Sequence, residues 1–211
     1  GIQTGGIPPF LFNLAGVTVW NYFKECLVST SDTFKKNESI FGKVYFPRVI
    51  VPMSIVVSNL LKFSIQMGVF IVFYVYFIAT GSNIRPSIWI LAFPILVVYM
   101  GMLGLGFGMI ISSMVTKYRD LTFLVSFGVQ LLMYVSLVTI PLTLIEDKVP
   151  ELLWIIDINP MAYIIETSRF VLLGQGVFTP MTIVYLGFGS LLVFLLGLLI
   201  FNKTEKSFID T

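Results

Sequence analysis

The chain has 211 residues with a net charge of +2, and 57% of them are hydrophobic while 11% are charged. Soluble domains carry about 25% charged residues, and a core of this size cannot bury so much apolar surface, so the composition excludes a soluble protein. A single cysteine without any histidine excludes an intrachain disulfide and a Cys/His metal site, and the small net charge gives no reason to expect a nucleic-acid partner.

Five apolar stretches follow one another along the chain, and a helix needs about 20 such residues to cross a bilayer. They cover residues 10–33, 49–79, 87–115, 121–145 and 182–201. The first stretch is only marginally hydrophobic, so an interfacial helix is an alternative there. Pro94 is expected to kink the third, and residues 203–211 are expected to form a polar tail. The predicted fold class is an all-α polytopic membrane protein.

The basic residues set the predicted orientation, because lysine and arginine accumulate on the cytoplasmic side of a membrane. A cytoplasmic C-terminus puts nine of them on that side, namely Lys24, Lys35, Lys36, Lys43, Arg48, Lys117, Arg119, Lys203 and Lys206. Three then lie outside, namely Arg85, Lys148 and Arg169. This orientation places Gly1 outside as well. We therefore expect one further span upstream, giving six in the intact protein.

The segment 34–48 connects the first two spans and ends in a basic, proline-punctuated sequence. Pro47 and Pro52 disfavour a regular helix around them, since each lacks an N–H and restricts the preceding residue. This predicts a stiff cytoplasmic loop that can transmit force into the second span. Lys43 and Arg48 either bind lipid phosphate at the cytoplasmic face or only determine topology.

No nucleotide-hydrolysing motif accompanies these spans. Gly42 and Lys43 are preceded by Asn37 where a P-loop needs glycine, and they are followed by Val44. The chain is therefore predicted not to be an enzyme, and any energy source must lie in another subunit.

Three ionisable residues fall inside predicted spans, where charged groups are expensive and usually functional. Lys24 and Glu25 either pair or extend toward the interface. Lys62 lies in the middle of the second span and faces either a polar pathway or a neighbouring helix. A relay of intramembrane carboxylates is not visible, which disfavours an ion-driven transporter.

The third span carries small residues at Gly104, Gly108 and Ser112, a spacing that lets helix backbones approach closely. Two interpretations are open: packing within one chain, and a seam between two copies. On the fourth span, four residues share one face by their helical spacing. They are Phe123, Phe127, Gln130 and Tyr134. This face suits either sugar rings or ordinary lipid and helix packing, and Trp20 on the first span admits the same two interpretations.

The segment 146–181 is too amphipathic for a plain loop. Pro150 is placed to begin a short helix over 150–157, and Asn159 with Pro160 predicts a turn. A second helix should cover 161–173 and end at the glycines that follow. Glu166 and Arg169 at i, i+3 can pair on one face, and an exposed pair would contribute little.

Several motifs resemble, in order, the membrane subunit of ABC-2 type polysaccharide exporters. They are PPFLFNLAGVTVWNYF at 8–23, KVYFPR at 43–48, KYRD at 117–120, NP at 159–160 and ETSRFVLLG at 166–174. That family includes O-antigen and teichoic acid exporter permeases. The resemblance covers essentially the whole chain and implies six transmembrane helices in the bacterial cytoplasmic membrane.

The resemblance also implies partners. The permease would form a homodimer with two ATPase subunits, which would bind ATP and Mg while this chain holds no cofactor. The cargo would be an undecaprenyl-diphosphate-linked glycan. The coupling element would include Lys35, Lys36, Lys43, Tyr45, Phe46, Pro47 and Arg48. The channel candidates are Trp20, Phe123, Phe127, Gln130 and Tyr134. The extracytoplasmic gate segment would include Trp154, Asn159, Pro160, Glu166 and Arg169.

Two other classes remain as alternatives. An ion-gradient-driven flippase for lipid-linked glycans would need intramembrane carboxylates. A membrane glycolipid transferase would need clustered acids at the interface, and only Glu146, Asp147 and Glu151 are available for that.

Overall fold

The computed structural model describes residues 6–41, 47–82, 84, 87–115, 118 and 120–209, with side chains left out at 38–41 and 205–209. Within these ranges every regular element is a helix, as the sequence predicted. The elements are α1 (Pro9–Ser31), α2 (Thr33–Phe41), α3 (Ile50–Ala79), η1 (Ile88–Ala92), α4 (Phe93–Val115), α5 (Leu121–Val135), α6 (Leu142–Lys148), η2 (Pro150–Leu152), α7 (Leu153–Ile158), α8 (Pro160–Leu173) and α9 (Pro180–Ile209).

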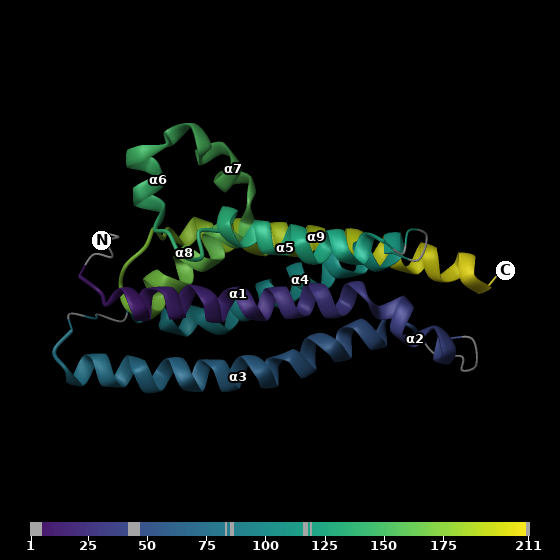
Figure 1. Ribbon diagram of the computed structural model, residues 1–211, viewed down its shortest axis with the longest axis horizontal. Helices are drawn as coiled ribbons and strands as arrows, with labels where there is room; N and C mark the ends of the chain where they lie inside the picture. Colours follow the sequence, from purple (N-terminus) through teal and green to yellow (C-terminus); the bar gives the residue numbers. More distant parts are fainter. Residues whose placement is uncertain are drawn as a thin grey trace.

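The long helices run side by side along one axis (Figure 1). Helix α1 packs against α3, α4 and α8, and α4 packs against α9 on its other side. Helix α2 and the C-terminus lie at one end of the bundle. At the other end α6 and α7 project sideways as an arm, which we call the α6–α7 arm (142–158).

Among the described residues, three helices combine the length and the apolar composition that a membrane crossing requires. They cover Ile50–Ala79, Ile88–Val115 and Pro180–Thr204. These agree with three of the predicted spans and confirm a multi-pass membrane protein. Helix α1 has 23 residues but is more polar, and its buried face, with Leu11, Val19 and Trp20, is enclosed by protein. Its marginal hydrophobicity reflects this position inside the bundle.

Small residues bring α4 close to its neighbours on both sides. A Cβ atom on Gly104 would lie 2.7 Å from Cys26 Cβ, and one on Gly108 would lie 2.5 Å from Thr30 Cβ. The glycine spacing therefore serves packing within one chain, and α1 already occupies the face that the alternative assigned to a second copy. On the opposite side of α4, Gly106 allows the same close approach by α9.

The predicted span over 121–145 is not one continuous helix. Helix α5 ends at Val135 after 15 residues, and Leu137 then adopts a positive φ of 57°. The chain resumes as α6 only after Pro141, which has no N–H to continue a helix. This interruption between α5 and α6, residues 136–140, lies beside helix α8.

One smaller expectation was also wrong. Pro94 does not kink a helix, because it is the second residue of α4, where a missing N–H leaves no intrahelical bond unmade. After the last predicted span, α9 continues through the polar residues to Ile209.

Candidate gate and transport surfaces

Helix α8 begins and ends where the sequence predicted. The Asn159 side-chain oxygen accepts a hydrogen bond from the Met161 N–H at 3.0 Å, and Pro160 fills the first helical position. Gly174 ends the helix in the left-handed conformation with φ of 76°. The Asn159 amide nitrogen also donates to Ser136 Oγ at 2.9 Å, so the start of α8 holds the interruption after α5.

Arg169 holds the same interruption from within α8. Its Nη1 donates to the Leu137 carbonyl at 2.9 Å and to Glu166 Oε1 at 3.0 Å. Its Nη2 donates to the Val138 carbonyl. The guanidinium carbon lies 3.8 Å from the ring centroid of Phe12 on α1, a cation–π contact. We call Glu166 and Arg169 with these contacts the α8 anchor.

Glu166 and Arg169 form the predicted i, i+3 pair, and the α8 anchor is buried. The side chains of Arg169 and Glu166 are 0% and 3% exposed. Burial raises the pKa of the Glu166 carboxyl, and the neighbouring Arg169 charge opposes that shift. Removing one partner of a buried ion pair leaves the other charge buried and unpaired, which is costly, so the anchor fixes α1, α8 and the 136–140 interruption relative to one another.

Glycines on two sides make room for this anchor. A Cβ atom on Gly16 of α1 would lie 2.6 Å from Arg169 Nη2. A Cβ atom on Gly176, whose φ is 139°, would lie 2.6 Å from the Glu166 carbonyl oxygen. Sequence reasoning missed Gly16 and Phe12, since nothing in the sequence marks them as neighbours of a residue about 150 positions further on.

The α6–α7 arm presents large apolar side chains away from the bundle. Trp154 is 64% exposed and Ile158 is 70% exposed. Where the arm meets α8, the Tyr163 hydroxyl donates to Asp157 Oδ1 at 2.6 Å, which raises the pKa of Tyr163 to about 12. The arm is thus amphipathic and anchored at its base.

Helix α5 exposes the four residues that were predicted to share a face. Phe123, Phe127 and Tyr134 are more than half exposed, and Gln130 is exposed with them. Trp20 is different, because it is 1% exposed and packs against Phe23 in the core, with ring centroids 5.4 Å apart. The channel-lining assignment of Trp20 was therefore wrong for this chain. Its position on the inner face of α1 explains its burial.

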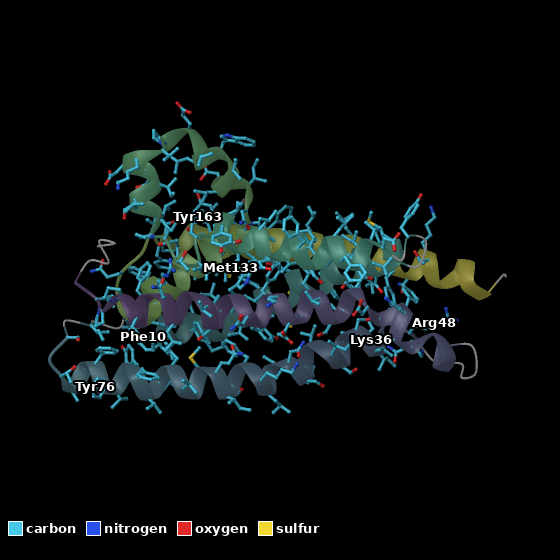
Figure 2. All side chains as sticks on the ribbon, viewed as in Figure 1. Phe10, Lys36, Arg48, Tyr76, Met133 and Tyr163 are labelled. Atoms are coloured by element: carbon cyan, nitrogen blue, oxygen red, sulfur yellow. The ribbon has the colours of Figure 1, made fainter. Side chains whose placement is uncertain are left out.

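Basic residues gather at the end of the bundle opposite the arm. Figure 2 shows Lys36 and Arg48 there, while Phe10 and Tyr76 lie at the other end. Lys35 and Lys36 are exposed on α2, and Lys36 Nζ lies 3.0 Å from Asp32 Oδ2. Pro47 and Arg48 precede α3 in a turn. Lys43, Tyr45 and Phe46 lie outside the described residues.

A bundle of apolar helices with a basic end and an anchored amphipathic arm defines a multi-pass membrane protein. The sequence matches the family described as ABC-2 type transporter over residues 6–173, and the chain belongs to that family. This confirms the resemblance drawn from the sequence motifs.

Within this family, the chain is similar to permease proteins of O-antigen export systems. An O-antigen export system permease protein RfbA of Klebsiella pneumoniae is 30% identical over 203 residues, which is 95% of this chain and 74% of the relative. A second RfbA from that organism is 29% identical over the same shares. The RfbA of Myxococcus xanthus is 25% identical over 161 residues, 76% of this chain and 60% of the relative.

Proposed function

We propose that this chain is the membrane-spanning permease subunit of an ATP-driven ABC exporter that moves a lipid-linked polysaccharide out of the bacterial cytoplasm. The observation that carries this proposal is the similarity to O-antigen export permeases along 95% of the chain. The cargo class is an undecaprenyl-diphosphate-linked glycan of the O-antigen type, with teichoic acid or another glycan as the alternative.

The exposed face of α5 supports a glycan as cargo. Phe127 and Tyr134 offer ring faces on which the C–H faces of a sugar can stack. Gln130 lies between them and offers an amide to sugar hydroxyls. A second copy of the chain facing this surface would enclose a path with aromatic walls, so we propose a homodimer with α5 beside the path.

The basic end of the bundle supports coupling to a separate ATPase subunit. Helix α2 is a short surface element that packs on α4, and α3 begins within three residues of Pro47. A partner that pushes on α2 or on the turn at Arg48 therefore pushes directly on a helix that can cross the membrane. We therefore propose that the C-terminus of α9, which lies at the same end of the bundle as α2, is cytoplasmic.

The opposite end supports a gate. The α6–α7 arm is amphipathic and lies at the end away from the basic residues, as expected for helices that rest in the outer leaflet. The α8 anchor ties the base of this arm to α1. Movement of α1 would thus be transmitted to the arm through Arg169.

A co-purification experiment tests the permease assignment. The chain is expressed with the ABC ATPase encoded beside it, and ATP hydrolysis is measured in lipid nanodiscs for wild type, Lys36→Glu, Arg48→Glu and the control Lys148→Glu. Lys148 is an exposed lysine on the arm, at the other end of the molecule. We expect the two basic-end reversals to lower permease-dependent hydrolysis several-fold and the control to leave it unchanged. A failure to form any ATPase complex would instead favour a gradient-driven flippase.

A further inference from the structure

An ion pair joins α1 and α3 on a face that is open in this chain. Lys62 Nζ lies 3.1 Å from Glu25 Oε2, and the two side chains are 61% and 41% exposed. Lys62 is twelve residues beyond Ile50 in α3, about 18 Å along the axis at 1.5 Å per residue. Lys62 lies within three residues of the midpoint of this 30-residue helix, so a centred α3 places it inside the hydrocarbon core. A charge exposed to acyl chains there is expensive, so this face requires a polar surrounding.

The ion pair is the middle of a longer polar feature. Helices α1 and α3 run in opposite directions (Figure 1), and side chains four residues apart lie on one helix face. Four residues to one side of the pair stand Asn21 and Gln66, and four residues to the other side stand Ser29 and Ser58. The ring of Phe10 on α1 contacts Phe73 and Phe77 on α3, with centroids 4.9 Å and 6.4 Å apart, so the two helices stay side by side beyond these levels.

These three levels form what we call the polar ladder. Its members, all partly or fully exposed, are Asn21, Glu25, Ser29, Ser58, Lys62 and Gln66. The levels are about 6 Å apart, so the ladder extends about 12 Å through the middle of α3. A single ion pair could be a structural accident of two packed helices. Two further levels in the same register indicate a continuous polar surface.

A buried polar group lies behind the ladder. Asn59 is 4% exposed, and its side-chain amide lies next to the Cys26 thiol, a weak hydrogen-bond acceptor. The seam between α1 and α3 thus has a polar side chain on its inner side and a polar ladder on its outer side.

The far face of α3 is the opposite in character. Val57, Ile71 and Val75 lie about 140–180° around the helix from Lys62, at about 100° per residue, and all three are aliphatic and more than half exposed. That face suits acyl chains. Two sides of one membrane-crossing helix therefore present different chemistry to their surroundings.

We infer that the polar ladder faces a hydrated path within the membrane, and that it takes water and neutral hydroxyl-bearing groups rather than acyl chains. The ladder consists of amides, hydroxyls and one ion pair of zero net charge, so it favours neither anions nor cations. A sugar chain in transit fits this chemistry, and that assignment rests on the proposed function. The hydration itself does not depend on which cargo the protein carries.

Thiol labelling in membrane vesicles tests the inference, using the chain with its ATPase partner in a Cys26→Ala background. Ser58→Cys and Gln66→Cys lie on the ladder, and Val57→Cys and Ile71→Cys are controls on the far face. The reactive thiolate needs water, so we expect a charged methanethiosulfonate reagent to label the ladder positions at least about tenfold faster than the controls. Cationic and anionic reagents should label the ladder at similar rates.

Equal labelling of ladder and control positions would overturn the inference, whether all four are fast or all four are slow. A strong preference for one reagent charge would overturn the neutral character of the path. If an α3 variant fails to assemble, Asn21→Cys and Ser29→Cys on α1 report on the same levels. Loss of ATPase coupling with hydrated ladder positions would count against the proposed function alone.

Discussion

Replacing Arg169 with methionine is the perturbation for which the structure gives the clearest magnitude. Methionine keeps an apolar side chain of similar length but removes every donor. The Glu166 carboxylate and the carbonyls of Leu137 and Val138 then lose their guanidinium partner, at a site where the two paired side chains are 0% and 3% exposed. Breaking a buried ion pair from one side costs about 3–5 kcal/mol. For a chain of this length that lowers the melting temperature by roughly 6–20 °C.

Thermal unfolding in lipid nanodiscs, followed by intrinsic fluorescence, measures this loss. Lys148→Met is the matched control, since Lys148 is exposed on the arm, and it should change stability by less than about 0.5 kcal/mol. The double variant with Glu166→Gln removes both charges and should recover part of the loss, with a coupling of about 0.5–3 kcal/mol. An Arg169→Met melting temperature within 2 °C of the control (about 1 kcal/mol or less), or strictly additive single variants, would refute the anchoring role.

Three further predictions use the same preparations. Gly108→Ala should lower the free energy of unfolding by about 1–3 kcal/mol, because its new Cβ atom would lie 2.5 Å from the Thr30 side chain on α1. Gly68→Ala is the control and should change stability little, since no atom lies within 4 Å of its new Cβ. Equal melting temperatures for the two variants would contradict the α1–α4 packing. Phe127→Ala and Tyr134→Ala should slow glycan export without reducing the amount of assembled complex, and unchanged export in both would remove α5 from the path. Asn159→Ala should lower the free energy of unfolding by about 1 kcal/mol, because the N-cap of α8 is lost, and thermal unfolding measures this. A loss of stability no larger than that of the Lys148→Met control would argue against the cap.

Local signals in the sequence were enough to predict the long apolar helices and the first and last residues of α8. Helices α3, α4 and α9 follow from runs longer than a bilayer requires, which depend on no distant residue. Asn159 and Gly174 act on their own neighbours, so their roles could be predicted from position alone.

The interruption after α5 could not be predicted in this way. Residues 121–145 are mainly apolar, and Pro141 marks where α6 can begin but not the end of α5 six residues earlier. Arg169 stabilises the break, because its side chain donates hydrogen bonds to two backbone carbonyls more than 30 positions earlier in the chain. A single sequence does not report that distance.

The burial of Trp20 and the partner of Lys62 were hidden for the same reason. Trp20 is buried because α1 packs against α3, α4 and α8, and this arrangement depends on tertiary contacts that local sequence signals do not encode. Lys62 pairs with Glu25 across 37 positions, through a register between two antiparallel helices. The sequence predicted charged residues within spans but not which of them meet.

Export itself is the most direct measurement: the amount of lipid-linked glycan that reaches the outer face of the cytoplasmic membrane in cells that make the glycan but lack their own exporter. Cells supplied with this chain and its ATPase partner should display the glycan. Cells supplied with the chain and a hydrolysis-deficient ATPase, or with the ATPase alone, should retain it on the cytoplasmic face. Display that persists without ATP hydrolysis, or without this chain, would contradict the assignment of an ATP-driven polysaccharide export permease.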